Sequence, residues 1–257
     1  MTDNTIGIMG AMPEEIDSIV SLLSKVSKHQ VGGRTYYEGY LNNIKAIVVF
    51  SRWGKVAAAA TATTLILKFK IKELIFSGVA GAVNPNLNIG DIVIGKRFFQ
   101  HDMDARPLMK QFEIPLLNIS YFESPKDKTA LFQSTINELL DQQNLLKVIP
   151  QEDLQEFNIH NPQLYIGDIA SGDKFFAKEE DKQQLLSLLP NVLCVEMEGA
   201  AVAQIAYEYQ VPYSIIRTIS DAADEQAKVN FPAFIQNISS QYSSEIIKLY
   251  FSRLLLS

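Results

Sequence analysis

The sequence predicts an α/β protein in which one mostly parallel β-sheet is covered by helices on both faces. Short runs rich in β-branched residues alternate along the chain with longer segments of helical periodicity, as is typical of such a sheet. The chain has 257 residues, of which 47% are hydrophobic, so a single domain can bury a substantial core. It contains no internal repeat and no low-complexity segment.

The predicted strands are short apolar runs bounded by turn residues. They are Ile6–Met9, Lys45–Phe50, Glu73–Ser77, Asp91–Ile94, Tyr165–Ala170, Val192–Glu196 and Pro212–Ser220. The segment "RTYYEGYL" (residues 34–41), which precedes the second of these strands, predicts a hairpin arm.

The predicted helices are longer segments with helical spacing of apolar residues. They are Pro13–Lys25, Lys55–Phe69, Lys128–Asn144, Glu179–Leu188, Glu198–Tyr209 and Pro232–Leu254. Between Lys147 and Leu164 the chain is polar, contains two prolines and has no clear period. This stretch predicts a surface excursion within the domain.

Charge and composition exclude several classes of function. The formal net charge is −6 and basic residues form no run, which argues against nucleic acid or an anionic membrane as the main partner. The single cysteine, Cys194, lies in the apolar stretch "VLCVE" and predicts a buried side chain in a reducing compartment. No signal peptide is evident, and the apolar window Val56–Leu67 is shorter than the roughly 18 residues of a membrane span. We therefore expect a soluble, cytoplasmic protein.

Acidic residues and glycines gather directly after the predicted strands. Ligands of α/β sheets bind beyond the carboxyl ends of the strands, and glycine lets the backbone approach them closely. The segments concerned are "GAMPEE" (10–15), "SGVAGAV" (77–83), "ASGDKFF" (170–176), "VEMEGAA" (195–201) and "RTISDAAD" (217–224). This clustering predicts a binding site at that edge of the sheet.

The first of these segments does not form a dinucleotide site. Such a site needs G-x-G-x-x-G, whereas the chain offers only Gly7 and Gly10, and no acidic residue closes the next strand, "VVFSRW". A P-loop is also absent from the sequence.

Glu196 and Glu198 stand two residues apart in an apolar setting where a strand gives way to a helix. An unpaired buried carboxylate costs several kcal/mol, so at least one of the two is expected to face a polar cavity. The alternative is that both lie in solvent at a helix start, where carboxylates favour the helix dipole. Asp221 is open to two similar interpretations, as a helix N-cap or as a proton donor at the end of its strand.

Two other segments are weaker candidates for a site. "HDMDARP" (residues 101–107) contains His101, Asp102 and Asp104, but no further histidine stands at ligand spacing. We expect a loop or a subunit contact there rather than a metal. In "GDKFF", Phe175 and Phe176 are either core aromatics or rings that stack on a flat ligand.

The motifs "IGIMGAMPEEI", "SGVAGA", "NIGDIVI", "SGDKFF", "VEMEGAAVAQ" and "RTISDAAD" together resemble those of the 5′-methylthioadenosine/S-adenosylhomocysteine nucleosidases. These enzymes belong to the nucleoside phosphorylase superfamily, and the motifs occur in the family order over nearly the whole chain. The resemblance implies a single nucleoside phosphorylase-like domain over residues 1–257, with a central twisted mixed β-sheet flanked by helices. It implies hydrolysis of the N-glycosidic bond of the thioadenosine, releasing adenine and a thioribose, without cofactor or metal. 5′-Deoxyadenosine and aminodeoxyfutalosine stay open as further substrates.

The same resemblance implies roles for individual residues. Glu15 is the base that activates water, and Asp221 is the acid that protonates N7 of adenine. Glu198 accepts hydrogen bonds from the ribose hydroxyls, and Phe175 stacks on the adenine. The other substrate-binding residues that it implies are Met12, Val79, Gly81, Phe176, Met197, Arg217 and Ser220, with Arg217 holding the water.

Chemistry supports this division of roles independently. Breaking an N-ribosyl bond builds positive charge on the sugar, which carboxylates stabilise, and adenine leaves readily only when protonated. Asp221 therefore needs a raised pKa, and the Arg217 side chain is expected to point toward Glu15. The resemblance also sets Val79 at a position where many relatives carry a hydroxyl residue.

Two other functions compete with hydrolysis. A phosphorylase of the same fold would use phosphate in place of water, but "GAMPEE" and "SGVAGA" offer no Arg or Lys to hold it. A non-catalytic adenosine-binding protein is the other alternative, but the presence of Glu15, Glu198 and Asp221 together argues against it. The resemblance also implies a homodimer in which each pocket is completed by its neighbour, and the apolar segment "WGKVAAAATATTLIL" fits such an interface.

Overall fold

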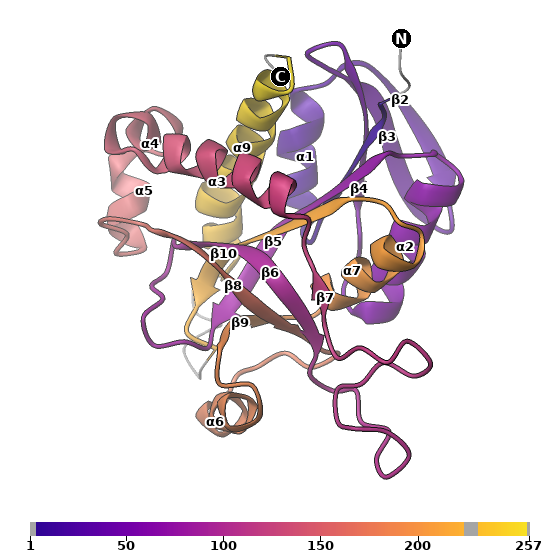
Figure 1. Ribbon diagram of the computed structural model, residues 1–257. Coiled ribbons are helices and arrows are strands. Elements are labelled where there is room, and N and C mark those ends of the chain that lie inside the picture. The colour runs from indigo at the N-terminus through magenta and orange to yellow at the C-terminus, as the bar shows by residue number, and fades with distance from the viewer. Residues whose placement is uncertain (1–3, 224–230, 256–257) are drawn as a thin grey trace.

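Ten strands of the described residues join in one mixed β-sheet (Figure 1). The computed structural model describes residues 4–223 and 231–255. The strands are β1 (Ile6–Gly10), β2 (Ser24–Val31), β3 (Arg34–Leu41), β4 (Ile44–Phe50), β5 (Glu73–Ala82), β6 (Ile92–Gln100), β7 (Phe122–Glu123), β8 (Leu164–Ser171), β9 (Val192–Glu196) and β10 (Tyr213–Asp221). The helices are α1 (Pro13–Ser21), α2 (Lys55–Leu67), α3 (Lys126–Leu140), α4 (Gln142–Val148), α5 (Gln151–Glu156), α6 (Glu179–Leu188), α7 (Gly199–Glu208), α8 (Phe231–Phe234) and α9 (Ser240–Arg253), with a π-helical turn η1 (Ile235–Ser239) before α9.

The pairing around β5 closes part of the sheet into a ring. β5 pairs with β9 and β10, β10 pairs with β6, and β8 joins β6 to β9. β1, β4, β3 and β2 extend from β5 as an open arm. The β5–β9, β6–β10, β2–β3 and β3–β4 pairs are antiparallel. The mixed sheet implied by the resemblance is therefore confirmed. Five of the seven pairs among the predicted strands are parallel, as expected for those strands, and the antiparallel pairs of β2, β3 and β7 make the whole sheet evenly mixed.

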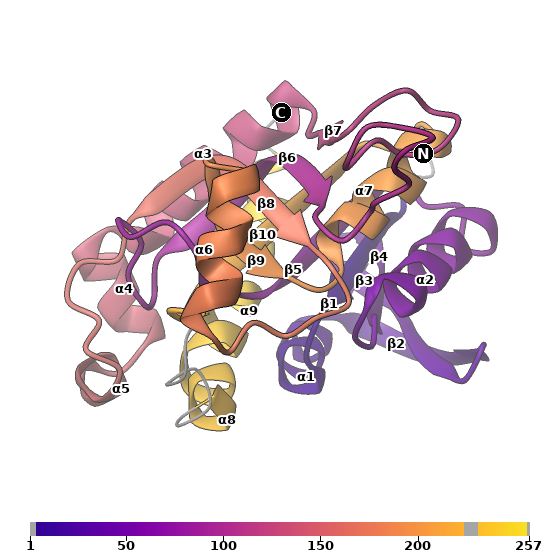
Figure 2. The ribbon, with the colours of Figure 1, turned by 90° about the horizontal axis from the view of Figure 1, so that it is seen from below.

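Helices cover both faces of the sheet, as predicted (Figures 1 and 2). Side chains of β4 alternate between the two layers, as the period of a strand requires. Ile47 and Val49 join a core cluster with residues of α2 and α7. Ala46 and Val48 join another cluster, with residues of α1, α3 and α9.

The seven predicted strands all form, but two of them extend further than expected. β5 runs on to Ala82 and β6 to Gln100, so residues 78–82 are strand residues rather than a loop. β2 and the two-residue β7 were not predicted. β2 was not predicted because it is largely exposed and polar and therefore lacks the apolar alternation of a half-buried strand.

Several predicted helix boundaries were wrong. The first helix ends at Ser21, because the chain turns into β2 at Ser24. The helix expected over 128–144 begins at Lys126 and ends at Leu140, where Asp141 accepts a hydrogen bond from the Gln143 N–H at 3.1 Å and caps α4. The helix expected over 232–254 is divided by the π-helical turn η1.

The stretch 147–164 is more than a polar excursion. It contains α5, and its apolar residues Leu154, Phe157 and Ile159 are buried in the core cluster of α3 and α9. The ring of Phe157 meets that of Phe234 edge-on, with centroids 5.3 Å apart. This stretch therefore supports the C-terminal helices.

Cys194 is fully buried in β9, as predicted, and burial raises the pKa of its thiol. The thiol is consequently protonated and unreactive at neutral pH. Within residues 4–223 and 231–255, no helix is long and apolar enough to cross a membrane.

Candidate active site

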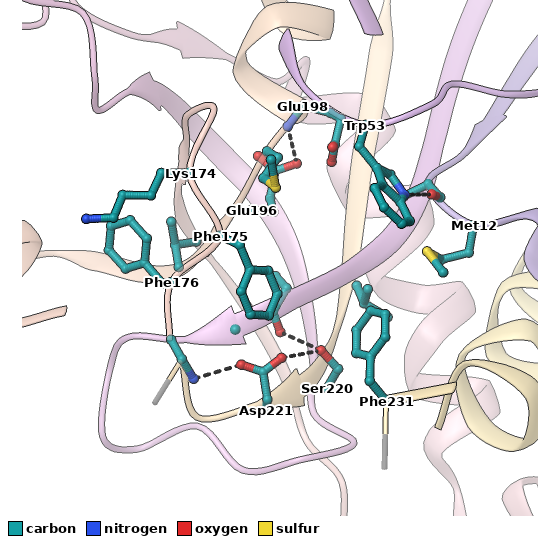
Figure 3. A pocket seen from close by; sticks show the side chains of 17 residues that line it. Met12, Trp53, Lys174, Phe175, Phe176, Glu196, Glu198, Ser220, Asp221 and Phe231 are labelled. Carbon is teal, nitrogen blue, oxygen red and sulfur yellow. Dashed lines mark hydrogen bonds between the residues drawn. The ribbon is translucent and has the colours of Figure 1, made fainter. Parts of the chain in front are cut away.

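A cavity of about 370 Å³ opens at the carboxyl ends of β1, β4, β5, β8, β9 and β10 (Figure 3). Most of the residues predicted for the site line this cavity. They are Met12, Val79, Gly81, Phe175, Phe176, Met197, Glu198, Ser220 and Asp221. The other two, Glu15 and Arg217, are fully buried and are not among the described lining residues. The sheet therefore brings the predicted strand-end segments to one place.

Aromatic side chains form two walls of the cavity. Phe175 extends into its centre and is about half exposed, whereas Phe176 is buried in a core cluster. Trp53 and Phe231 lie across from them, beside Met12 (Figure 3). The indole N–H of Trp53 donates to the Ala11 carbonyl oxygen at 3.1 Å, which fixes the ring at the mouth of the cavity.

Glu196 and Glu198 differ sharply in their partners. The carboxylate of Glu196 accepts hydrogen bonds from the N–H groups of Glu198 and Gly199, from the Ser171 hydroxyl, and from Arg217 Nη2 at 2.7 Å. Arg217 also donates to the carbonyl oxygens of Phe76 and Ile216. This buried ion pair anchors the junction between β9 and α7.

Glu198 is the N-cap residue of α7, and its carboxylate lines the cavity. Its Oε1 accepts a hydrogen bond from the Gly54 N–H at 2.9 Å. Burial and the neighbouring Glu196 charge raise the pKa of Glu198 to about 7, against the opposing effects of Arg217 and the Gly54 N–H. Glu196 also lines the cavity, so the expectation that at least one of the two glutamates faces a cavity is met, although this cavity is mainly apolar and not polar.

Asp221 ends β10 at the opposite end of the cavity from Glu198 (Figure 3). Its Oδ2 accepts from the Ser220 hydroxyl at 2.7 Å, and its Oδ1 accepts from the Ala223 N–H at 2.8 Å. A side chain at Gly81 would meet Asp221 Oδ1 at 2.8 Å, so only glycine fits there without displacing the carboxylate. Asp224, the last residue of the same motif, lies outside the described residues.

Glu15 is buried deeper in the core, in the first turn of α1. Its Oε2 accepts from the Met12 N–H at 3.1 Å, and its Oε1 accepts from the Ser239 hydroxyl at 2.5 Å. Burial raises the pKa of Glu15, although the hydrogen bond from Ser239 and the Arg217 charge both oppose this. The site thus contains carboxyl groups with raised pKa values, as acid–base chemistry near neutral pH requires.

Comparison with known proteins agrees with this geometry. The family model described as "Phosphorylase superfamily" matches residues 5–252. The chain belongs to the phosphorylase superfamily. A 5′-methylthioadenosine/S-adenosylhomocysteine nucleosidase of Staphylococcus aureus (strain bovine RF122 / ET3-1) is 32% identical over 250 residues, which cover 97% of this chain and 100% of that protein.

Two solved structures from the superfamily are similar over almost their full length. Futalosine hydrolase of Helicobacter pylori strain 26695 is 34% identical with a TM-score of 0.82, covering 97% of this chain and 98% of that one. S-adenosylhomocysteine nucleosidase from Streptococcus pyogenes, solved with 5-methylthiotubericidin, is 31% identical with a TM-score of 0.83, covering 99% of this chain and 98% of that one. The predicted resemblance to the nucleosidases of this superfamily is confirmed.

Several residues that line the cavity of this superfamily member were not predicted from the sequence, above all Trp53 and Phe231. Trp53 follows β4 in "SRWGK" (51–55), and its place after a predicted strand is its only signal in the sequence. Phe231 begins α8 far from any predicted strand end, and no sequence pattern pointed to it.

The segment "HDMDARP" contains ion pairs. Lys55 Nζ lies 2.6 Å from Asp102 Oδ1, and Arg106 Nη2 lies 2.5 Å from Asp104 Oδ2. His101 is half-buried behind Phe176, with the two rings edge to face at 5.3 Å. In the part of the chain that the structure describes, no three His, Cys, Asp or Glu residues are grouped so as to hold a metal.

Proposed function

We propose that this protein hydrolyses the N-glycosidic bond of 5′-methylthioadenosine and S-adenosylhomocysteine, within one catalytic domain spanning residues 1–257. The observation that carries the proposal is the placement of Glu198 and Asp221 at opposite ends of one cavity, with the Phe175 ring between them (Figure 3). A nucleoside has ribose hydroxyls at one end and a flat base at the other, so the cavity matches its two ends. Full-length likeness to nucleosidases supports the same activity.

In this proposal the base binds between Phe175 and Asp221. Phe175 stacks on the adenine ring, and the backbone of Phe176 contacts its edge. Asp221 gives a proton to N7, which converts adenine into a neutral leaving group. The Ser220 hydroxyl and the Ala223 N–H hold the carboxyl group in place.

The ribose lies over Met197, and Glu198 accepts hydrogen bonds from the ribose hydroxyl groups. A carboxylate at this position also stabilises the positive charge that develops on the sugar as the bond breaks. Met12, Trp53 and Phe231 leave an apolar wall for the 5′ substituent. Whether 5′-deoxyadenosine and aminodeoxyfutalosine are accepted depends on this wall, and the likeness to a futalosine hydrolase supports testing the second.

Glu15 is the proposed base that takes a proton from water. Its backbone neighbours Ala11 and Met12 line the cavity, and its raised pKa suits a base that works near neutral pH. Arg217 is close enough to lower the Glu15 pKa, and its Nε is buried without a partner among the described residues. This N–H group is the proposed donor to the water, and Val79 lines the cavity nearby without a hydroxyl.

A phosphate-dependent phosphorylase is the main alternative. Among the described lining residues Lys174 is the one cation, and its ammonium group already lies 2.7 Å from Asp181 Oδ1. Arg217 is paired with Glu196, and Glu15 would repel an anion. These contacts favour water over phosphate as the nucleophile.

The deciding experiment incubates the protein with 5′-methylthioadenosine in phosphate-free buffer and measures free adenine. We expect adenine release that added phosphate does not increase. A strict requirement for phosphate would identify a phosphorylase, and binding of the nucleoside without any adenine release would identify a non-catalytic binding protein.

A homodimer in a cytoplasmic location stays a prediction from the sequence and its resemblance. The exposed face of α2 supports an interface, because Val56 is 81% exposed and Leu67 is also exposed on the same side of the helix. Trp53 adjoins this face and lines the cavity, so a neighbouring subunit there would help to close the site.

A further inference from the structure

Three loops meet at one small cluster of charged groups beside the cavity, which we call the clamp: Lys55, Asp102 and Asp173. Lys55 begins α2 after β4, Asp102 follows β6, and Asp173 follows β8. Lys55 Nζ donates to Asp102 Oδ1 at 2.6 Å, and the Asp173 N–H donates to Asp102 Oδ2 at 3.0 Å. The Lys55 N–H donates in turn to Asp173 Oδ1 at 2.8 Å. Each loop is therefore bonded to the other two.

The clamp adjoins residues that line the cavity. Gly54, next to Lys55, donates its N–H to Glu198 Oε1, and Trp53 precedes it in the chain. Gly54 has a φ of 88°, and a side chain there would come within 2.9 Å of Asp173 Oδ1. Phe175 lies two residues beyond Asp173. Movement of the clamp would thus displace the Glu198 partner and the aromatic walls together.

The ion pair of the clamp is partly shielded from solvent. The side chain of Lys55 is 17% exposed and that of Asp102 is 33% exposed. Lys55 Nζ also contacts Gln100 Oε1 at 3.3 Å, and Gln100 Nε2 donates to Gln204 Oε1 of α7 at 2.6 Å. The ammonium group is therefore linked to the helix that Glu198 begins.

We propose that the Lys55–Asp102 ion pair positions the Gly54 N–H against Glu198 and so prepares that carboxylate to bind the ribose. Lys55 and Asp102 are positioning residues, because they act through Gly54 and are not among the lining residues of the cavity. This inference rests on the proposed role of Glu198. It also gives a function to the "HDMD" segment, which the proposed chemistry otherwise leaves unused.

Loss of the clamp should shift the pKa of Glu198 in one direction, which can be measured. Glu198 accepts from the Gly54 N–H, and the charges that act on it are those of the Glu196 carboxylate of β9 and the Arg217 guanidinium of β10. Because the Gly54 N–H favours the ionised form of Glu198, its displacement raises the pKa of that carboxyl. The acid limb of the pH profile of kcat/KM then moves to higher pH, and KM for the nucleoside rises.

The test compares Asp102→Asn with Asp104→Asn, two carboxylates in the same loop of which only the first is in the clamp. For Asp102→Asn we expect KM for 5′-methylthioadenosine to rise about tenfold, as for loss of one hydrogen bond to a charged group, with the acid limb shifted upward. Asp104→Asn serves as the control and should match the parent protein both in KM and in the position of the acid limb. If Asp102→Asn is poorly folded, Lys55→Met takes its place and Lys55→Arg should recover part of the loss.

A second measurement needs no substrate. Trp53 is the single tryptophan of the chain, so its fluorescence reports directly on the loop that holds Gly54. We expect acrylamide to quench Trp53 more strongly in Asp102→Asn than in Asp104→Asn or the parent.

The outcomes separate the two proposals. Absence of adenine release from the parent would refute the proposed function, while the quenching comparison would still decide whether the clamp holds the loop. An active parent with unchanged KM, pH profile and quenching in Asp102→Asn would refute the clamp alone. Equal effects of Asp102→Asn and Asp104→Asn would also refute it.

Discussion

Two glutamates only two residues apart show how strongly local partners divide chemical roles. Glu196 is held by Arg217 and by backbone N–H groups, whereas Glu198 is buried with fewer donors and has a pKa raised to about 7. A buried carboxyl group with a raised pKa keeps its proton in the folded state while the unfolded chain ionises. Stability therefore falls as pH rises from about 4.5, the ordinary value, toward 7.

Replacing Glu198 tests whether its ionisation destabilises the folded protein. Glu198→Gln removes the ionisation, so we expect its Tm to exceed that of the parent by a few degrees at pH 8, with the difference vanishing near pH 4. The exposed Glu156→Gln serves as the control and should leave Tm unchanged. Adenine release by Glu198→Gln should fall because the ribose acceptor is weakened. Equal Tm values at pH 8 would show that Glu198 ionises without penalty.

Glu15→Gln tests the proposed base. Glutamine is nearly isosteric and can still accept from Ser239, but it cannot take a proton from water. We expect the fold and nucleoside affinity to persist, while kcat falls about 10²–10⁴-fold. Glu14→Gln is the matched control, and a rate for Glu15→Gln within a few-fold of the parent would assign the base elsewhere.

Asp221→Asn tests the proposed acid. Asparagine can donate a hydrogen bond to N7 but cannot transfer a proton. Adenine release should collapse while the affinity for a non-cleavable adenosine analogue, measured by calorimetry, is retained. Near-parental turnover would show that Asp221 is a structural cap and not the acid.

The residues that the sequence reveals are those whose chemistry is unusual for their place in a strand–loop pattern. Glu198 and Asp221 stand out because carboxylates are costly at the ends of apolar strands. Trp53 also follows a strand, but an aromatic side chain carries no such cost there and gives no comparable signal. The hydrogen bond from Ser239 that holds the Glu15 carboxylate joins residues 224 positions apart, and no local sequence pattern encodes such a contact.

At the scale of elements, the junction of β9 and α7 depends on the buried pair of Arg217 and Glu196. Both side chains are almost completely inaccessible, so removing one charge leaves the other buried without its partner. We expect Arg217→Met to lower the free energy of unfolding by about 3–5 kcal/mol, measured by urea denaturation. Arg106→Met is the control, since Arg106 pairs with Asp104 but the two side chains are 56% and 42% exposed, so its loss leaves no buried charge and should cost little. Equal losses for the two variants would contradict the special role of the buried pair.

Element types were easier to predict than element ends. Apolar periodicity identified the buried strands but not the exposed, polar β2. The ends of α1 and α3 depend on the turn into β2 and on the cap by Asp141. The closure of the ring by β5 and β10 also lies outside sequence reasoning, because strand order depends on long-range pairing.

At the scale of the whole molecule, the exposed apolar face of α2 bears on assembly. Ala60 lies on that face, one turn from Val56 and two turns from Leu67. We expect Ala60→Glu to shift the sedimentation of the protein from dimer toward monomer and to lower activity. Leu188→Glu on α6, an exposed apolar residue elsewhere, should do neither. A parent that sediments as a fully active monomer would contradict the dimer.

The hydrogen bond between Glu15 and Ser239 has a consequence for the order in which the working protein is made. The carboxylate is translated near the start of the chain, and its hydroxyl partner sits in η1, close to the last helix. Contacts of such long sequence separation form late, because the intervening chain must first be ordered. During synthesis, the nascent sheet therefore carries an unseated Glu15 until the C-terminal helices dock. Under the proposed role of Glu15, catalytic activity then requires that the C-terminal helices have docked.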